Sequence, residues 1–268
     1  MTTVIAWVAV DQRGPSALYL ASDSRITWGS QQLRWDVGRK LFACRRSPDV
    51  FAYSGEVLFP SLVLGQIVEA ADCGVLMSSD DPSARHRSFA NAVRGSFAVR
   101  RVPPSTSFEI LHASRASFGM TATFRVWKLS FDFSSRSWKD EEASVPMKES
   151  ALIVTLGSGE SAFRSQIATH LQTSQGRTSR ATFWAFCDAL RQANDPFTGG
   201  APQLVGIYRT GEPKVFGIIY QGQRFFQGLS LEGSDQFDMV EWRDELFQRV
   251  DGGSKLLISG AQRHGRGN

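Results

Sequence analysis

The hydrophobic positions of the chain begin almost at its first residue. Apolar stretches cover 3–10 and 17–22, and the intervening 11–15 is rich in the residues that hairpin turns favour. We therefore predict an N-terminal β-hairpin that ties the chain terminus to the core. A second pair of strands is predicted at 39–44 and 50–53.

Helical periodicity follows in the next part of the chain. The segment 58–71 is almost continuously apolar, as in a buried helix. The segment 78–82 carries helix-start signals, and Phe89, Ala92, Val93 and Phe97 then recur at helical spacing. Two helices are thus expected before residue 100.

The pattern then alternates between strands and helices. Alternation predicts a strand at 127–133 with a hairpin partner at 137–145, and a short apolar strand is predicted at 151–156. Two helices are expected after Gly159, the second carrying Phe183, Phe186, Cys187 and Leu190 on one face.

The last part of the chain predicts two further strands, at 203–208 and 214–220, and a final helix over 235–250. Runs of strands separated by pairs of helices favour antiparallel sheets covered by helices, an α+β fold, over alternating βαβ units. We predict one main domain over 1–222. The remainder, 223–268, is expected to be a C-terminal extension with one helix and a basic tail that frays at its end.

Composition excludes several classes of protein. The chain has 268 residues, of which 42% are hydrophobic and 21% charged, as in a globular protein with a sizeable core. It lacks an apolar run near the ~20 residues of a membrane helix and a leader-like N-terminal segment. We expect a cytoplasmic protein without a membrane partner.

The charge distribution and the placement of cysteine and histidine exclude further classes of protein. The net charge of +4 is spread along the chain without the clustered basic and aromatic residues of a nucleic-acid interface. Three distant cysteines fit a reducing compartment, and four scattered histidines lack metal-ligand spacing. We therefore expect no nucleic acid, no metal and no cofactor.

The N-terminus itself is the first candidate for chemistry. Removal of Met1, which the small Thr2 permits, would leave a threonine with a hydroxyl and a free α-amine. A hydroxyl needs an adjacent base to become a nucleophile, and an α-amine with a pKa of about 8 can accept its proton. The alternative is that Thr2 and Thr3 only begin an edge strand.

Lys40 and Asp23 form the second candidate. Lys40 is the only lysine among the first 127 residues of a chain that otherwise uses arginine, and a lysine, unlike an arginine, loses its proton readily when desolvated. Asp23 ends an apolar strand and could hold such a lysine. The alternatives are a surface lysine and an aspartate in a turn.

Glycine-containing turns supply the remaining candidates. Gly55, after a predicted strand, could present its N–H to an oxyanion, or it could merely begin a helix. Ser158 lies between two glycines but in no phosphate-binding motif. Asp195 and Thr198 precede paired glycines and could equally form a plain turn.

Taken in order, these motifs resemble a known family. They are Thr2-Thr3, Ala21-Ser22-Asp23-Ser24-Arg25, Arg39-Lys40, Tyr53-Ser54-Gly55, Gly157-Ser158-Gly159 and Asp195-Pro196-Phe197-Thr198-Gly199-Gly200. The set resembles the proteasome β-subunit and HslV family of N-terminal-nucleophile hydrolases, over roughly 2–220. Since the chain is longer than HslV, the bacterial proteasome homologues are the more similar branch.

The resemblance implies a role for each candidate. Thr2 would be the nucleophile and its α-amine the base, with Lys40 lowering the proton affinity of the amine and Asp23 orienting Lys40. Arg39 is a rival for the lysine position. The other implied roles are oxyanion binding by the Gly55 N–H, support of the terminus by Ser158, Asp195 and Thr198, peptide alignment by the backbone of Thr27 and Val57, and a side-chain pocket bordered by Ile26, Tyr53 and Val57.

The resemblance also implies a fold and an activity. The fold would be a four-layer α-β-β-α sandwich of two antiparallel sheets, and the activity that of a threonine endopeptidase in self-compartmentalising homo-oligomeric rings. Its substrates would be unfolded proteins or peptides, and an ATPase unfoldase would be a partner. The alternatives are a catalytically silent scaffold subunit of the same fold, or one that keeps Met1, and an acylase for small amides.

Overall fold

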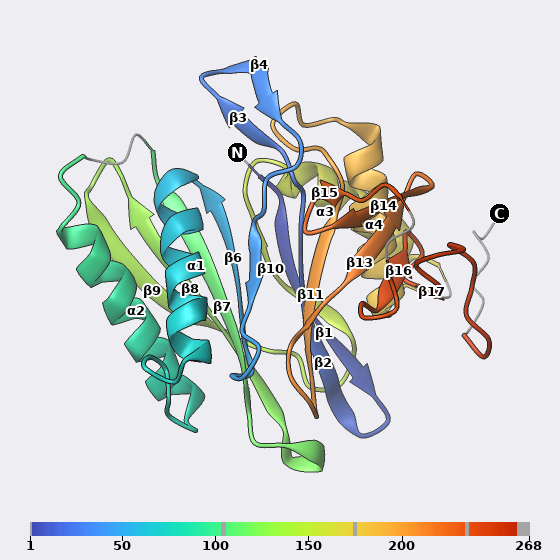
Figure 1. The fold of residues 1–268 in the computed structure, drawn as a ribbon, viewed down its shortest axis with the longest axis horizontal. Coiled ribbons are helices and arrows are strands. Elements are labelled where there is room, and N and C mark those ends of the chain that lie inside the picture. Colours follow the sequence, from blue (N-terminus) through green and yellow to red (C-terminus); the bar gives the residue numbers. More distant parts are fainter. Residues whose placement is uncertain (1, 103–105, 174–175, 234–235, 262–268) are drawn as a thin grey trace.

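The N-terminal hairpin lies at the centre of a five-stranded antiparallel sheet. The computed structural model describes residues 2–102, 106–173, 176–233 and 236–261 (Figure 1). The strands of this first sheet are, in spatial order, β10 (Ala151–Leu156), β1 (Val4–Asp11), β2 (Gly14–Ser22), β11 (Gln203–Tyr208) and β12 (Lys214–Val215). Val4 pairs with both Ser22 and Leu156, so the chain terminus enters between two strands.

A second five-stranded antiparallel sheet is built from the middle of the chain. Its strands are, in spatial order, β5 (Leu41–Ala43), β6 (Asp49–Gly55), β7 (Phe108–Ala116), β8 (Thr123–Asp132) and β9 (Ser137–Ala143). The hydrophobic pattern did not predict β7. This strand carries buried polar residues, among them His112 and Ser114, which interrupt the expected alternation.

The alternating side chains of the strands divide the core. On β1, Ile5 and Trp7 pack with the helices α3 (Glu160–Leu171) and α4 (Ser179–Gln192). Val4 and Ala6 of the same strand join a separate cluster with residues of the second sheet, as period-two side-chain orientation requires. The N-terminal strand is therefore buried on both faces.

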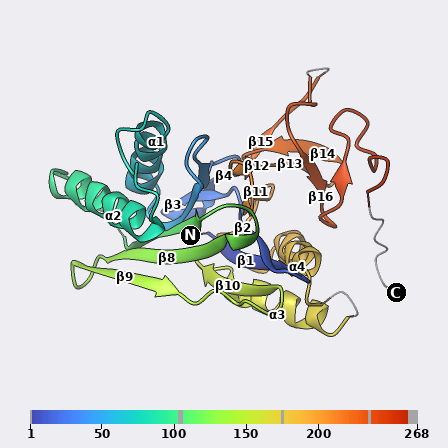
Figure 2. The same cartoon turned by 90° about the horizontal axis from the view of Figure 1, so that it is seen from below.

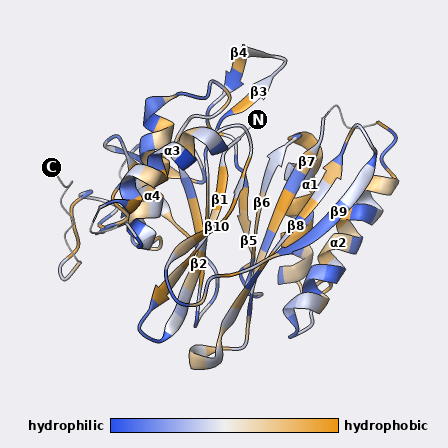
Figure 3. Cartoon of the chain, turned by 180° about the vertical axis from the view of Figure 1, so that it is seen from behind, coloured by the Kyte–Doolittle hydropathy of each residue, from blue (hydrophilic) through white to orange (hydrophobic). Residues whose placement is uncertain are grey.

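The helices α1 (Leu58–Asp72) and α2 (Pro82–Ala98) cover the other face of the second sheet (Figures 1 and 2). The predicted start of α2 is confirmed, because Asp81 accepts hydrogen bonds from the backbone N–H groups of Ser83 and Ala84. Figure 3 shows the two helix pairs on opposite sides of the strands. None of the described helices is long and apolar enough to cross a membrane.

A short hairpin projects from the sheets beside the N-terminus (Figure 1). It consists of β3 (Ile26–Trp28) and β4 (Ser30–Trp35), and it connects Asp23 to Lys40 along the chain. The sequence pattern did not predict this pair. Trp28 and Trp35 are about half exposed on it.

The C-terminal part forms a third sheet instead of the predicted helix. Its strands are, in spatial order, β15 (Leu229–Ser230), β14 (Gln223–Phe226), β13 (Gly217–Tyr220), β16 (Trp242–Asp244) and β17 (Arg249–Val250). The helix prediction over 235–250 is wrong for its described residues. The Asp244 carboxylate accepts the backbone N–H groups of Leu246 and Gln248, a turn that competes with a helix.

Burial of Trp242 explains why β16, which precedes the turn at Asp244, is a strand. Its ring packs directly on Gly217 of β13, where an added Cβ would lie 2.4 Å from the indole, and the two residues are paired in parallel strands. The predicted strand at 214–220 is divided into β12 and β13 at Phe216. The frayed tail predicted at the chain end falls mostly on 262–268, outside the described residues.

Candidate active site

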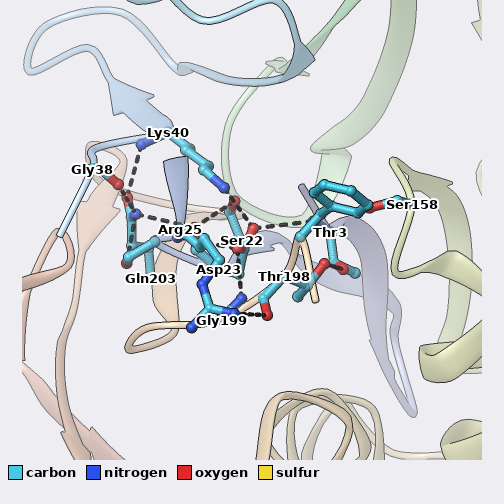
Figure 4. A network of polar contacts seen from close by, with 12 residues as sticks. Thr3, Ser22, Asp23, Arg25, Gly38, Lys40, Ser158, Thr198, Gly199 and Gln203 are labelled. Atoms are coloured by element: carbon cyan, nitrogen blue, oxygen red, sulfur yellow. Dashed lines mark hydrogen bonds and ion pairs between the residues drawn. The ribbon is translucent and has the colours of Figure 1, made fainter. Parts of the chain in front are cut away.

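The Asp23 carboxylate organises the chain around the N-terminus. Asp23 follows β2 directly and is completely buried. Its Oδ1 accepts hydrogen bonds from the Thr3 backbone N–H at 3.0 Å and from Lys40 Nζ at 2.7 Å (Figure 4). Its Oδ2 accepts the backbone N–H groups of Arg25 at 3.1 Å and Gly199 at 3.0 Å. One carboxylate thus joins four segments of the chain.

Lys40 is as buried as its partner. Neither side chain of the ion pair has exposed surface. Burial lowers the pKa of Lys40, and the Asp23 carboxylate opposes this shift while the Arg25 charge adds to it. The rival Arg39 lies elsewhere, with Nε donating to the Leu41 carbonyl and its guanidinium over the Phe42 ring. The structure therefore brings Lys40, and not Arg39, to Asp23.

A chain of hydroxyl groups supports the terminus from the opposite side. Thr198 Oγ1 donates to Asp195 Oδ2 at 2.7 Å, and Ser158 Oγ donates to the same oxygen at 2.5 Å. Thr3 Oγ1 lies 2.8 Å from Thr198 Oγ1. Because the Thr198 proton is directed to Asp195, Thr3 is the donor to Thr198. The three predicted support residues therefore meet at Asp195 Oδ2, and Thr198 connects them to Thr3.

Thr2 lies against Gly157 in a very narrow space. It is 2% exposed, and its carbonyl faces Gly157, which has a φ of +90°. A Cβ on Gly157 would lie 1.7 Å from the Thr2 oxygen, so a side chain at 157 would displace the terminus. The Thr2 side chain makes no hydrogen bond to another described residue, while Met1 lies outside the described part.

Gly55 and Glu56 lie at the end of the inner strand β6. Gly55 ends that strand with a φ of +91°, and it is not a member of the network around Asp23. Glu56 accepts the Phe59 backbone N–H at 2.9 Å and lies 3.3 Å from an Arg100 nitrogen. The Glu56 charge is therefore directed to the start of α1.

The residues predicted to bind substrate differ in exposure. Tyr53 is completely buried in the core under α1, and its hydroxyl donates to the Arg39 carbonyl at 3.2 Å. Burial raises the pKa of Tyr53. Ile26 is 5% exposed, whereas Thr27 and Val57 are half-buried. Thr27 and Val57 are therefore the members of the set with surface available to a peptide.

Sequence reasoning did not single out Arg25 for a role. Its guanidinium makes a bidentate pair with Asp36 at 2.7 and 2.8 Å. Its Nη1 also donates to the carbonyls of Pro196 and Thr198. Arg25 thus fixes the loop that carries Thr198 and Gly199. The only signal in the sequence was its place directly after Asp23 and Ser24.

Gln203 is the second residue that the sequence did not indicate. Its side-chain amide contacts the backbone of Lys40 and Asp23.

Among the described residues, no group of three or more His, Cys, Asp or Glu side chains is arranged to hold a metal ion.

The observed architecture is compatible with the fold that the resemblance implies. The described residues form a mixed α/β structure with several antiparallel sheets and four α-helices, and its buried lysine–aspartate pair lies at the chain terminus.

One solved structure with this fold is the Anbu (Gly-1) mutant from Hyphomicrobium sp. strain MC1. The TM-score is 0.53 at 14% sequence identity, over 87% of this chain and 89% of that chain. This neighbour supports a broadly proteasome-like fold. At this identity the similarity concerns the fold alone. No family model matches the chain, and no curated protein matches it.

Proposed function

We propose that the chain is a threonine-type endopeptidase whose nucleophile is Thr2 after loss of Met1. The observation that carries the proposal is the buried Lys40–Asp23 ion pair, which also holds the backbone of Thr3. A buried charge pair is costly to keep for stability alone. Beside an N-terminal threonine it has a chemical use, because an ammonium disfavours a second positive charge on the α-amine.

The reaction would be acyl transfer followed by hydrolysis. The Thr2 hydroxyl oxygen attacks the peptide carbonyl carbon and passes its proton to the Thr2 α-amine. That proton then moves to the leaving amine as the carbon–nitrogen bond breaks, which leaves an ester on Thr2. Water attacks the ester with the α-amine as base, the acid product leaves, and the hydroxyl is restored.

The surrounding residues would stabilise this reaction. The Gly55 N–H would bind the negative oxygen of the tetrahedral intermediate. Ser158, Asp195 and Thr198 would keep the terminus in place through Thr3, and the backbone of Thr27 and Val57 would align the peptide. No step requires a metal ion or a cofactor.

The proposal extends to the assembly. Two helix pairs on the outside of two sheets would form the four-layer α-β-β-α sandwich of the family. The subunits would assemble into homo-oligomeric rings that enclose the sites, and an ATPase unfoldase would deliver unfolded protein. Enclosure of the active sites inside the rings would restrict the peptidase to extended substrates.

A covalent inhibitor tests the nucleophile. A peptide epoxyketone should label the wild-type chain at Thr2 and fail to label Thr2→Ala, while the matched Thr2→Ser, which keeps a hydroxyl, should still be labelled. Intact mass should show that Met1 is absent. Equal labelling of wild type and Thr2→Ala would exclude the mechanism, and retention of Met1 would favour a silent scaffold subunit.

A further inference from the structure

Gln203 connects the two segments that supply Asp23 and Lys40. It is the first residue of β11, pairs with Ser22 in β2, and is 1% exposed. Its Oε1 accepts the Lys40 backbone N–H at 3.0 Å (Figure 4). Its Nε2 donates to the Gly38 carbonyl at 2.7 Å. The same amide therefore fixes both ends of the peptide segment that leads into Lys40.

The other contacts of the Gln203 amide reach the Asp23 segment. Nε2 lies 2.9 Å from Ser24 Oγ and 3.3 Å from the Asp23 carbonyl. Ser24 Oγ donates its own proton to the Ala201 carbonyl at 2.6 Å, so a lone pair of that oxygen is free to accept from Gln203. The orientation of the amide is fixed, because the Lys40 N–H needs an oxygen and the Gly38 carbonyl needs an N–H.

The C-terminal sheet packs against Ser24 and the Gln203 amide through Gly228. Gly228, in the turn between β14 and β15, has a φ of +84°. A Cβ at this position would lie 2.4 Å from Ser24 Oγ and 3.2 Å from Gln203 Nε2. The turn therefore packs directly on the Gln203 amide. This contact gives the C-terminal extension a connection to the candidate active site.

We propose that Gln203 is a positioning residue that holds Lys40 against Asp23, and that the Gly228 turn of the C-terminal sheet keeps Gln203 in place. The proposal rests on the function proposed above. A backbone displaced at Gly38 or Lys40 would move the Lys40 ammonium away from the terminus. The α-amine would then regain proton affinity, and less of it would be free to act as a base at neutral pH.

Two readouts on Gln203→Leu test the inference. The first is hydrogen exchange of the Lys40 backbone amide, which should become at least ~10-fold faster while that of Ile207 in the same strand is unchanged. The second is the pH profile of Thr2 labelling by a peptide epoxyketone. Its rate at pH 7.5 should fall at least ~10-fold, and its acidic limb should move to higher pH.

A second pair of variants covers the case in which Gln203→Leu fails to fold. Gly228→Ala places a methyl group against Ser24 and Gln203. Gly222 has a similar φ of +76°, but the methyl group of Gly222→Ala would have no neighbour within 4 Å. Gly228→Ala should reproduce both effects in weaker form, and Gly222→Ala should show neither.

The outcomes separate this inference from the proposed function. Wild-type exchange at Lys40 and a wild-type pH profile in Gln203→Leu, or equal effects of Gly228→Ala and Gly222→Ala, would overturn the positioning role. If the wild-type chain is not labelled at all, the proposed function fails. In that case the exchange of the Lys40 amide still decides whether Gln203 holds the segment.

Discussion

The environment of Lys40 explains why a lysine occurs there in a chain that otherwise uses arginine. The ammonium is a compact charge that fits beside one oxygen of Asp23, and that carboxylate is further neutralised by three backbone N–H groups. A guanidinium would be larger and would stay charged. Only a lysine combines this size with a pKa that burial can lower.

Replacement of Lys40 by methionine should separate its two contributions. Lys40→Met keeps the volume but leaves Asp23 as a buried carboxylate without its ammonium, which should cost about 3 kcal/mol of folding free energy. Thr2 labelling should fall by about 100-fold or more, since the α-amine loses its electrostatic partner. Urea denaturation and labelling rates measure the two effects.

The matched control for this variant is Lys139→Met, because Lys139 is a lysine whose side chain is 70% exposed. It should change neither quantity. Wild-type labelling of a folded Lys40→Met protein would contradict the role of the ammonium.

At the scale of elements, the sequence predicted best where a segment is uniformly apolar and ends at a glycine or a polar turn. The strands at 151–156 and 203–208 are found with the predicted bounds as β10 and β11. The strand β7 was missed because several of its buried positions are polar. His112 and Ser114 are members of a buried network with Asp49 and Arg85, which no periodicity reveals.

The candidate site was predictable only in part. The order of Asp23 and Lys40 along the chain agrees with a known family, and the structure brings both to the terminus. Gln203 gave no such signal, because several of its partners are backbone atoms of Asp23, Gly38 and Lys40, more than 160 positions away. Contacts of this kind depend on the packing of strands and leave no residue pattern.

The helix α2 is joined to the second sheet through a pair of histidines. His86 Nδ1 lies 3.0 Å from His112 Nδ1, and His86 Nε2 lies 2.9 Å from Asp140 Oδ1. The His86 ring also stacks on Trp127. Burial, reinforced by the His112 charge and opposed by Asp140, lowers the pKa of His86 to about 4. His86 is therefore neutral in the folded protein at pH 7.

This shift makes stability depend on pH. The pKa of His86 is 6.5 in the unfolded chain and about 4 in the folded protein. The contribution of neutral His86 to the free energy of unfolding is therefore complete above about pH 6.5, and it is lost as the pH falls toward 4. The loss should reach about 3 kcal/mol. The free energy of unfolding, measured by urea denaturation, should differ less between pH 7.5 and pH 4.5 in His86→Gln than in wild type, by roughly that amount.

Arg87→Gln, an exposed change on the same helix, is the control for this pH dependence and should keep the wild-type difference. If the free energy of unfolding changes equally between the two pH values in wild type and in His86→Gln, a group other than His86 causes the pH dependence.

For the whole molecule, the projecting hairpin carries a group of three exposed large apolar side chains. Trp28 is 52% exposed, Leu33 61% and Trp35 49%, and all three lie on β3 or β4 beside the N-terminus (Figure 1). Large exposed apolar groups gathered in one place mark interaction surfaces in soluble proteins. In the ring assembly that we propose, this hairpin would contact a neighbouring copy close to the site.

Substitution on the hairpin therefore tests the assembly without entering the buried network. The double variant Trp28→Ser/Trp35→Ser should shift size-exclusion elution from a ring to a smaller species, because the copies lose apolar contact area. Val75→Ser, at a residue 78% exposed in the loop before α2, should leave the elution unchanged. Far-ultraviolet circular dichroism should be the same for all three proteins. A wild-type chain that elutes as a monomer, or a double variant that still elutes as a ring, would contradict the placement of the contact on this hairpin.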